Sequence, residues 1–186
     1  MTMKRKRSIT SSVPGLLFLM GLLLVATPSG AQAPGQLTGS ATTWDVGPDF
    51  IYITAPADIV DWTLAPGVNN VRSGTLNVDA TASWTVRVKD ADLLTSGRLT
   101  KYADGTGIYD TGIKLNSPLV ISASSDGGSE VALSTSEQEI ISGAATPEGG
   151  RDVGIEFKQP VGWNDLGLES GSSYRLVVTF TGSLTG

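Results

Sequence analysis

Apolar and polar residues alternate along most of the chain in short runs. The clearest run spans residues 82–89, where Trp84 and two valines alternate with polar neighbours. A period of two is typical of a β-strand that packs one face against a core. Residues 151–158 and 173–181 follow the same pattern, so all three segments are predicted to be half-buried strands.

Shorter runs rich in β-branched and aromatic residues predict further strands. No window of helical length shows a 3.6-residue period, and 23 glycines and 9 prolines would interrupt a helix. We therefore expect an all-β fold, a single antiparallel β-sandwich of immunoglobulin-like or jelly-roll-like layout. These further strands are expected at residues 50–54, 59–64, 74–78, 107–115, 119–123, 130–133 and 139–141.

Turn-forming residues separate these strands. Ser125–Gly128 contains Asp-Gly, which tolerates positive φ angles and predicts a two-residue hairpin turn. Residues 146–150 predict a longer loop, and residues 65–67 a tight reversal. The inward-facing positions give the predicted core: Trp62, Trp84, Val86, Val88, Val153, Ile155, Phe157, Tyr174, Leu176, Val178 and Phe180.

The N-terminal segment has the three parts of a secretory signal peptide. Four basic residues at 4–7 precede the apolar run 16–26, and Ala31-Gln32-Ala33 provides small residues for cleavage. The apolar run is shorter than the roughly 20 residues of a membrane-spanning helix. We expect cleavage after Ala33 and no membrane insertion of the mature chain. The predicted protein is therefore secreted, extracellular or at the cell surface.

The predicted organisation is a signal peptide at 1–33, an extended arm at 34–48 and the sandwich domain at 49–186. The arm is rich in Gly, Ser, Thr and Pro, and we expect one strand near 37–44. Residues 36–46 have the composition of a strand that could add to the sheet edge of a neighbouring subunit. Pairing within the arm's own domain, or no regular structure, are the alternatives, and we favour pairing within the domain.

The charge and the composition of the chain exclude several classes of binding partner and of catalytic site. Four of the 13 basic residues leave with the signal peptide, whereas all 18 acidic residues lie after it, so the mature chain has a formal charge of −9. This balance argues against nucleic acid or an anionic membrane surface as partner. The chain contains no cysteine and no histidine. Thiolate nucleophiles, histidine metal sites and Ser-His-Asp triads are thereby excluded.

Two loops carry candidate binding residues. Asp104 and Asp110 flank two glycines, and carboxylates on such a turn suit calcium. A plain hairpin turn with solvated aspartates explains the same pattern. Trp163, followed by Asn164 and Asp165 in a turn-rich loop, could stack on a sugar and bond its hydroxyls. Large aromatic residues of sandwiches are more often buried.

Catalysis would have to rely on carboxylates. Asp58 and Asp61 form one close pair along the sequence, and Glu137 and Glu139 form another. Glycosidases use two facing carboxylates, but charged residues also solubilise surfaces and protect strand edges. No nucleophile elbow, phosphate-binding loop or metal motif is present. We therefore expect no enzymatic activity, and no cofactor apart from the calcium considered above.

Three segments resemble the WxL-type cell-surface domains, which are exported all-β modules that associate with cell walls. They are Asp61-Trp62-Thr63-Leu64, the strand around Trp84, and the C-terminal residues 174–184. The family carries a second Trp-x-Leu in its last strand, where this chain has Phe180 and no tryptophan. The resemblance implies a non-catalytic extracellular role.

These patterns together predict a secreted, non-catalytic cell-surface or matrix module, for which self-assembly by edge-strand addition is one option. Its expected partners are other surface proteins or copies of itself. The alternative is a carbohydrate-binding or adhesion module that uses the loop around Trp163, with a glycan as partner.

Overall fold

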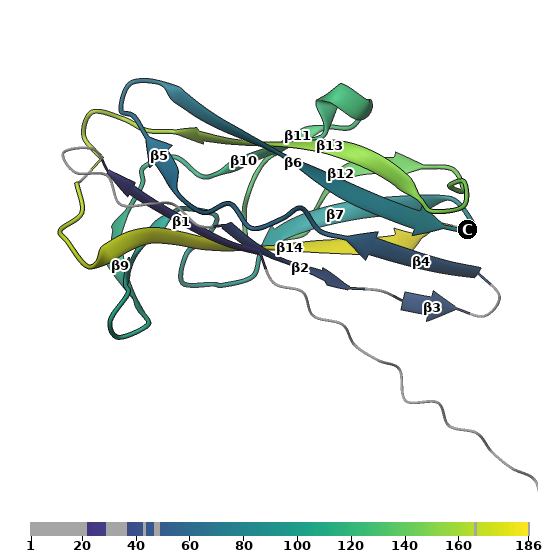
Figure 1. The fold of residues 1–186 in the computed structure, drawn as a ribbon, viewed down its shortest axis with the longest axis horizontal. Helices are drawn as coiled ribbons and strands as arrows, with labels where there is room; N and C mark the ends of the chain where they lie inside the picture. Colours follow the sequence, from purple (N-terminus) through teal and green to yellow (C-terminus); the bar gives the residue numbers. More distant parts are fainter. Residues whose placement is uncertain (1–21, 29–36, 43, 47–48, 166, 186) are drawn as a thin grey trace, which may run out of the picture.

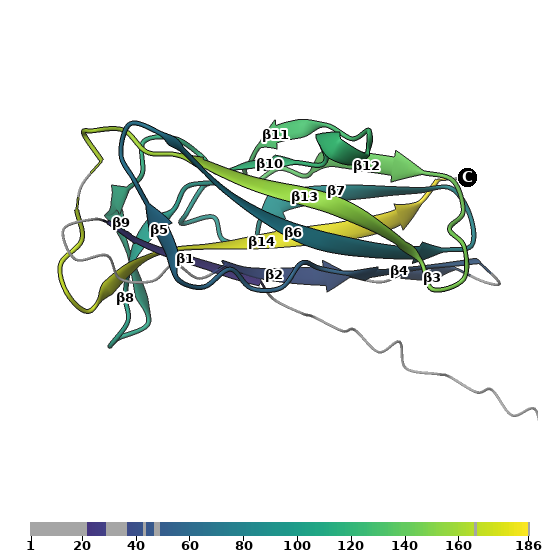
Figure 2. The ribbon, with the colours of Figure 1, turned by 45° about the horizontal axis from the view of Figure 1, so that its top comes forward.

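Two β-sheets pack face to face in the computed structural model (Figures 1 and 2). It describes the backbone of residues 22–28, 37–42 and 44–46, and backbone and side chains of residues 49–165 and 167–185. Within these residues the elements are strands β1 to β14 and one short 3-10 turn, η1 (Ser124–Asp126). The predicted all-β sandwich is confirmed.

The larger sheet contains eight strands, in the order β12-β7-β14-β2-β1-β5, with β8 and β9 continuing from β14. Most neighbours are antiparallel, but β1 pairs with β5 and β14 pairs with β2 in parallel. Its strands are β1 (Leu22–Pro28), β2 (Leu37–Thr42), β5 (Trp62–Leu64), β7 (Trp84–Asp90), β8 (Thr100–Ala103), β9 (Ile108–Lys114), β12 (Gln138–Gly143) and β14 (Ser172–Leu184).

The smaller sheet contains six strands, in the order β11-β10-β13-β6-β4-β3. Its longest pairing is the antiparallel pair β13–β6, which runs from Arg151 opposite Val78 to Pro160 opposite Asn69. Its strands are β3 (Trp44–Val46), β4 (Asp49–Thr54), β6 (Asn69–Ala80), β10 (Val120–Ser122), β11 (Glu130–Ala132) and β13 (Arg151–Pro160).

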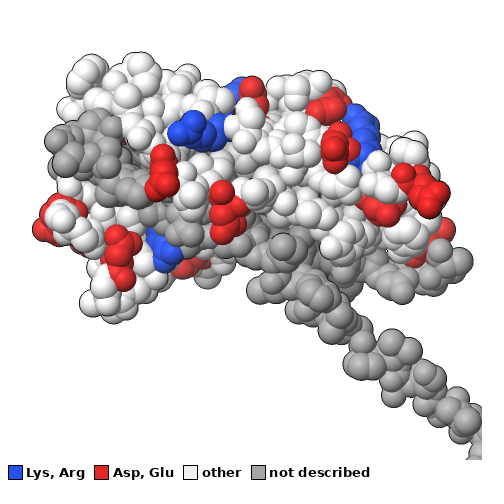
Figure 3. All heavy atoms as spheres, viewed as in Figure 1, with Lys and Arg blue, Asp and Glu red and all other residues white. Residues whose placement is uncertain are grey.

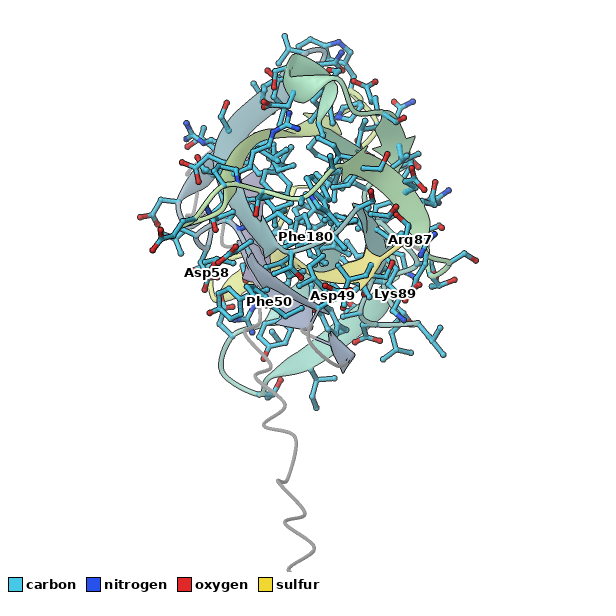
Figure 4. The ribbon with its side chains drawn as sticks, turned by 90° about the vertical axis from the view of Figure 1, so that its right-hand side faces the viewer. Asp49, Phe50, Asp58, Arg87, Lys89 and Phe180 are labelled. Carbon is cyan, nitrogen blue, oxygen red and sulfur yellow. The ribbon has the colours of Figure 1, made fainter. Side chains whose placement is uncertain are left out.

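The predicted core residues fill the space between the sheets. All of them are at most 2 % exposed, which confirms the sequence prediction. Figure 4 shows Phe180 between the two layers, with Arg87 and Lys89 of β7 on the outside. Strand β7 therefore buries one face, as its alternating sequence predicts, and its Arg87 and Lys89 on the other face are partly exposed.

The buried Trp84 requires a glycine on the neighbouring strand. A Cβ built on Gly143 of β12 would lie 2.6 Å from Cζ2 of the Trp84 indole. Trp84 pairs with Gly143 across the two strands, so the indole occupies space that any larger residue would fill. This close approach gives Gly143 a packing role in the core.

Three strands of the sandwich differ from the sequence prediction in their bounds or their presence. Strand β6 is much longer than the predicted run 74–78, because its register with β13 continues to Asn69. Strand β5 is shorter than predicted, because Asp61 adopts a positive φ of 58° just before it. Strand β8 was not predicted.

The turn between β10 and β11 was also predicted incorrectly. The two strands do form an antiparallel hairpin, with Ser122 opposite Glu130. Its connection is the 3-10 turn η1, ended by Gly127 at a φ of 83°, rather than a two-residue turn. The Asp-Gly pair thus supplies the expected positive φ within a longer loop.

Candidate functional site

Trp163 lies in the loop between β13 and β14, and its side chain is 80 % exposed. A Cβ built on Gly67 would fall 2.8 Å from the indole nitrogen, so the ring lies against the Gly67 turn. The backbone N–H of Gly67 donates to the carbonyl of Val161 at 2.7 Å, which joins the two loops. The structure thus places an exposed indole on a supported turn at one end of the sandwich.

Asp165 holds this loop in place. Its Oδ1 accepts hydrogen bonds from the backbone N–H of Asn116 at 2.8 Å and from the Asn116 amide at 2.6 Å. Its Oδ2 accepts from the backbone N–H of Gly162 at 2.7 Å. Both carboxylate oxygens therefore already have donors within the fold, whereas the neighbouring Asn164 is exposed.

The candidate calcium residues lie on the β8–β9 hairpin. Asp104 follows β8 and accepts a 2.6 Å hydrogen bond from the hydroxyl of Ser173. Asp110 of β9 lies opposite Lys101, with 3.7 Å between its Oδ2 and the ammonium nitrogen. Across the described residues, no group of three or more acidic side chains is placed to hold a metal ion. The calcium site stays a prediction.

The close acidic pair Glu137 and Glu139 faces basic residues of β7. Glu137 lies 3.2 Å from Lys89, and Glu139 lies 4.0 Å from Arg87. All four side chains are partly exposed at the edge of the larger sheet. On the face shown in Figure 3, acidic side chains are scattered over the surface, several of them beside a basic one. Such exposed pairs contribute little to stability but keep the surface polar.

A buried carboxylate that the sequence interpretation missed anchors the loop after β7. Asp90 is 3 % exposed and accepts hydrogen bonds from the Thr95 hydroxyl at 2.6 Å, the Gly97 N–H at 2.5 Å and the Asp92 N–H at 3.0 Å. Burial raises the pKa of Asp90 above its ordinary value, against the opposing effect of these hydrogen bonds. The loop is joined to β14, because the Ala91 N–H donates to the carbonyl of Val177 at 2.9 Å.

A second missed cluster covers the outer side of β14. The Arg175 guanidinium carbon lies 3.9 Å from the centroid of the Tyr102 ring, and Tyr102 packs edge-on against Tyr109. Burial raises the pKa of Tyr109, and it raises the pKa of the core residue Tyr174 to about 12. Both shifts favour the protonated hydroxyl. The three elements β8, β9 and β14 meet here.

Strand β1 lies within the predicted signal peptide and occupies a central place in the larger sheet. Its residues Leu22 to Ala26 pair antiparallel with β14, from Leu22 opposite Val178 to Ala26 opposite Tyr174. Its residues Ala26 to Pro28 pair in parallel with β5, from Trp62 to Leu64. Figure 1 shows β1 running along β14. The β1 strand thus bridges β14 and β5.

The predicted arm contributes strands β2 and β3, one to each sheet. Strand β2 pairs with β1 through Thr38 and Leu37 and with β14 through a single residue pair, Thr38 opposite Val177. Strand β3 pairs with β4 over three residues. The strand expected near 37–44 is present, and the described arm residues pair within their own chain.

Two sequence-based expectations lie outside what the structure describes: the cleavage site after Ala33 and the basic residues 4–7. No helix in the described ranges is both long enough and apolar enough to cross a membrane. Compared with known protein families, with curated proteins and with solved structures, the chain matches none.

Proposed function

We propose that this protein is an exported, non-catalytic structural module of the cell surface or extracellular matrix, which assembles with copies of itself by edge-strand addition. The predicted signal peptide supports export. The fold is compatible with a structural role, because Asp165 and Asp104 accept hydrogen bonds within the fold and Glu137 forms a surface ion pair. The resemblance to WxL-type domains points the same way and stays a prediction.

The small number of residue pairs that hold the arm strands β2 and β3 in their sheets is the observation that supports assembly. Strand β13 pairs with β6 over ten residues, and β14 pairs with β7 over seven. In contrast, β2 and β3 are each joined to their neighbours by three residue pairs. An arm with so few backbone pairings can leave its own domain and add to the sheet of another copy.

The experiment is to express the full chain in a bacterium that exports it and to purify the exported product. N-terminal sequencing is expected to begin at Pro34. Size-exclusion chromatography with light scattering is expected to give a mass that grows with protein concentration. An exported product that stays monomeric up to millimolar concentration would contradict assembly, and a product found only inside the cell would contradict export.

Exposure of Trp163 favours a second function, the binding of a carbohydrate. An indole that is 80 % exposed on a supported turn can stack on the apolar face of a sugar ring. A glycan array with the exported protein and its Trp163→Ala variant tests this function. Binding that is lost in the variant supports it, whereas binding that is unchanged, or no binding to any glycan, contradicts it.

A further inference from the structure

The strand that bridges β14 and β5 belongs to a segment that export is expected to remove. Strand β1 ends at Pro28, and the predicted cleavage lies after Ala33. The sandwich that contains β1 is therefore the sandwich of the unprocessed chain. The processed chain has to form its larger sheet from β2 onward.

Loss of β1 removes pairings from three strands at once. Five residues of β14, Tyr174 to Val178, lose their partners on one side. All three residues of β5 lose the pairing that joins them to the larger sheet. Strand β2 loses its pairings with β1 and keeps the single pair between Thr38 and Val177. Cleavage thus produces both a vacant strand position and a loosely held strand.

We infer that the processed domain is one strand short, and that the arm strand Leu37–Thr42 of a second copy fills the vacant position between β14 and β5. This inference rests on the proposed function. It adds which strands accept the partner strand, which segment is donated, and that removal of the signal peptide is required for assembly. Without the signal peptide, the chain lacks the strand that joins β14 to β5, and it requires a partner strand.

The vacant position has the properties of a strand acceptor. The β14 residues Tyr174, Leu176 and Val178 are buried in the core. Trp62 and Leu64 of β5, the strand on the opposite side of the vacant position, are also buried there. Without a strand between them, these apolar residues and the backbone groups of both strands would meet water. A strand from outside would cover the apolar residues and supply the missing backbone hydrogen bonds.

The arm has the properties of the donor. In residues 37–42 the small or apolar residues Leu37, Gly39 and Ala41 alternate with Thr and Ser, which is the period-two pattern of a strand. Its pairing of Thr38 with Val177 shows that this segment can pair with β14. It also lies at the new N-terminus of the processed chain.

Donor and acceptor are different segments of one chain, so the contact between copies is heterologous. Such contacts form rings when the rotation between copies closes and open chains when it does not. An arm that adds to a second copy leaves the position of its own copy open, so further copies can add. The proposal therefore predicts oligomers of varying length rather than one symmetric dimer.

The first test compares two forms of the protein by light scattering. The exported, processed chain is expected to form oligomers. The full chain 1–186, produced without export and carrying β1, is expected to be a monomer, with circular dichroism as the check that both are folded. If both forms assemble equally, the vacant position is not the acceptor, although the proposed function would stand. If the processed chain is monomeric, both proposals fail.

The second test uses a synthetic peptide with the sequence of Leu22–Pro28, extended by two lysines for solubility. A tenfold molar excess, added as processed protein refolds from urea, is expected to reduce the mean mass to that of one chain. The matched control is the same peptide with Leu24→Pro, because proline lacks the backbone N–H and is excluded from central strands. Equal effects of the two peptides, or no effect of either on an assembling protein, would overturn the inference.

Discussion

Two glycines with the same backbone conformation test how the loop beside β14 is packed. Gly97 has a φ of 77° and Gly127 a φ of 83°, so alanine is strained at both positions. A Cβ on Gly97 would lie 1.9 Å from the carbonyl oxygen of Leu133, whereas a Cβ on Gly127 would meet nothing within 4 Å. The pair therefore separates backbone strain from steric overlap.

The expected magnitudes follow from these two environments. Alanine in the left-handed region costs about 1–2 kcal/mol, and Gly127→Ala is expected to lose about 1 kcal/mol. Gly97→Ala adds overpacking of about 1–3 kcal/mol. It also displaces the Gly97 N–H from Asp90 and the Gly97 carbonyl from the Leu119 N–H. Gly97→Ala is therefore expected to lose about 3–5 kcal/mol in total.

Urea unfolding followed by tryptophan fluorescence measures both variants, since Trp62 and Trp84 are buried in the core and report its exposure. The midpoints are compared at one protein concentration, because assembly would also stabilise the folded state. If the two variants differ by less than about 1 kcal/mol, the close packing of Gly97 on Leu133 is wrong.

Three further substitutions test the other contacts. Asp90→Ala is expected to lose about 2–4 kcal/mol at neutral pH, because two buried donors lose their acceptor. Since the folded state raises the Asp90 pKa above 3.8, it binds the proton more tightly than the unfolded chain does. The contribution of Asp90 to stability therefore falls as the pH rises from 3.8 through the raised pKa, and the deficit of the variant should narrow over that window. A deficit that widens in urea melts across this window would contradict the reasoning. Tyr102→Leu removes the ring beneath Arg175 and is expected to lower the free energy of unfolding by about 0.5–2 kcal/mol, whereas an unchanged urea midpoint would contradict the cation–π contact. Asp165→Ala is expected to cost about 1–3 kcal/mol and to change the fluorescence of Trp163, and wild-type values in both measurements would contradict the anchoring of this loop.

Some strands alternate fully between apolar and polar residues. They could be predicted from the sequence, because every second side chain of such a strand points into the core. Strands β7, β13 and β14 are of this kind, and their inward residues are all in the core. Strand β8 has only four residues, too few for a period to be visible, and it exists because β14 and β9 flank it.

The candidate sites depended on contacts that the sequence does not display. Asp165 accepts hydrogen bonds from Asn116, 49 residues away, so its link between the Trp163 loop and that distant segment could not be predicted from its sequence neighbours. Strand β1 was missed for a different reason. An apolar run after basic residues has the composition both of an export signal and of a buried strand, and only the register with β14 reveals the second property.

Hydrogen–deuterium exchange of β14 tests whether a second copy adds a strand beside Tyr174–Val178. It is measured on the exported protein at several concentrations, with mass spectrometry of peptides that cover Tyr174–Val178. We predict that amides of this segment gain protection together with the increase in mass, while β13 stays protected throughout. Protection that is the same in the monomer and in the assembly would contradict the addition of a second copy's strand to β14. An assembly in which this segment still exchanges freely would contradict it as well.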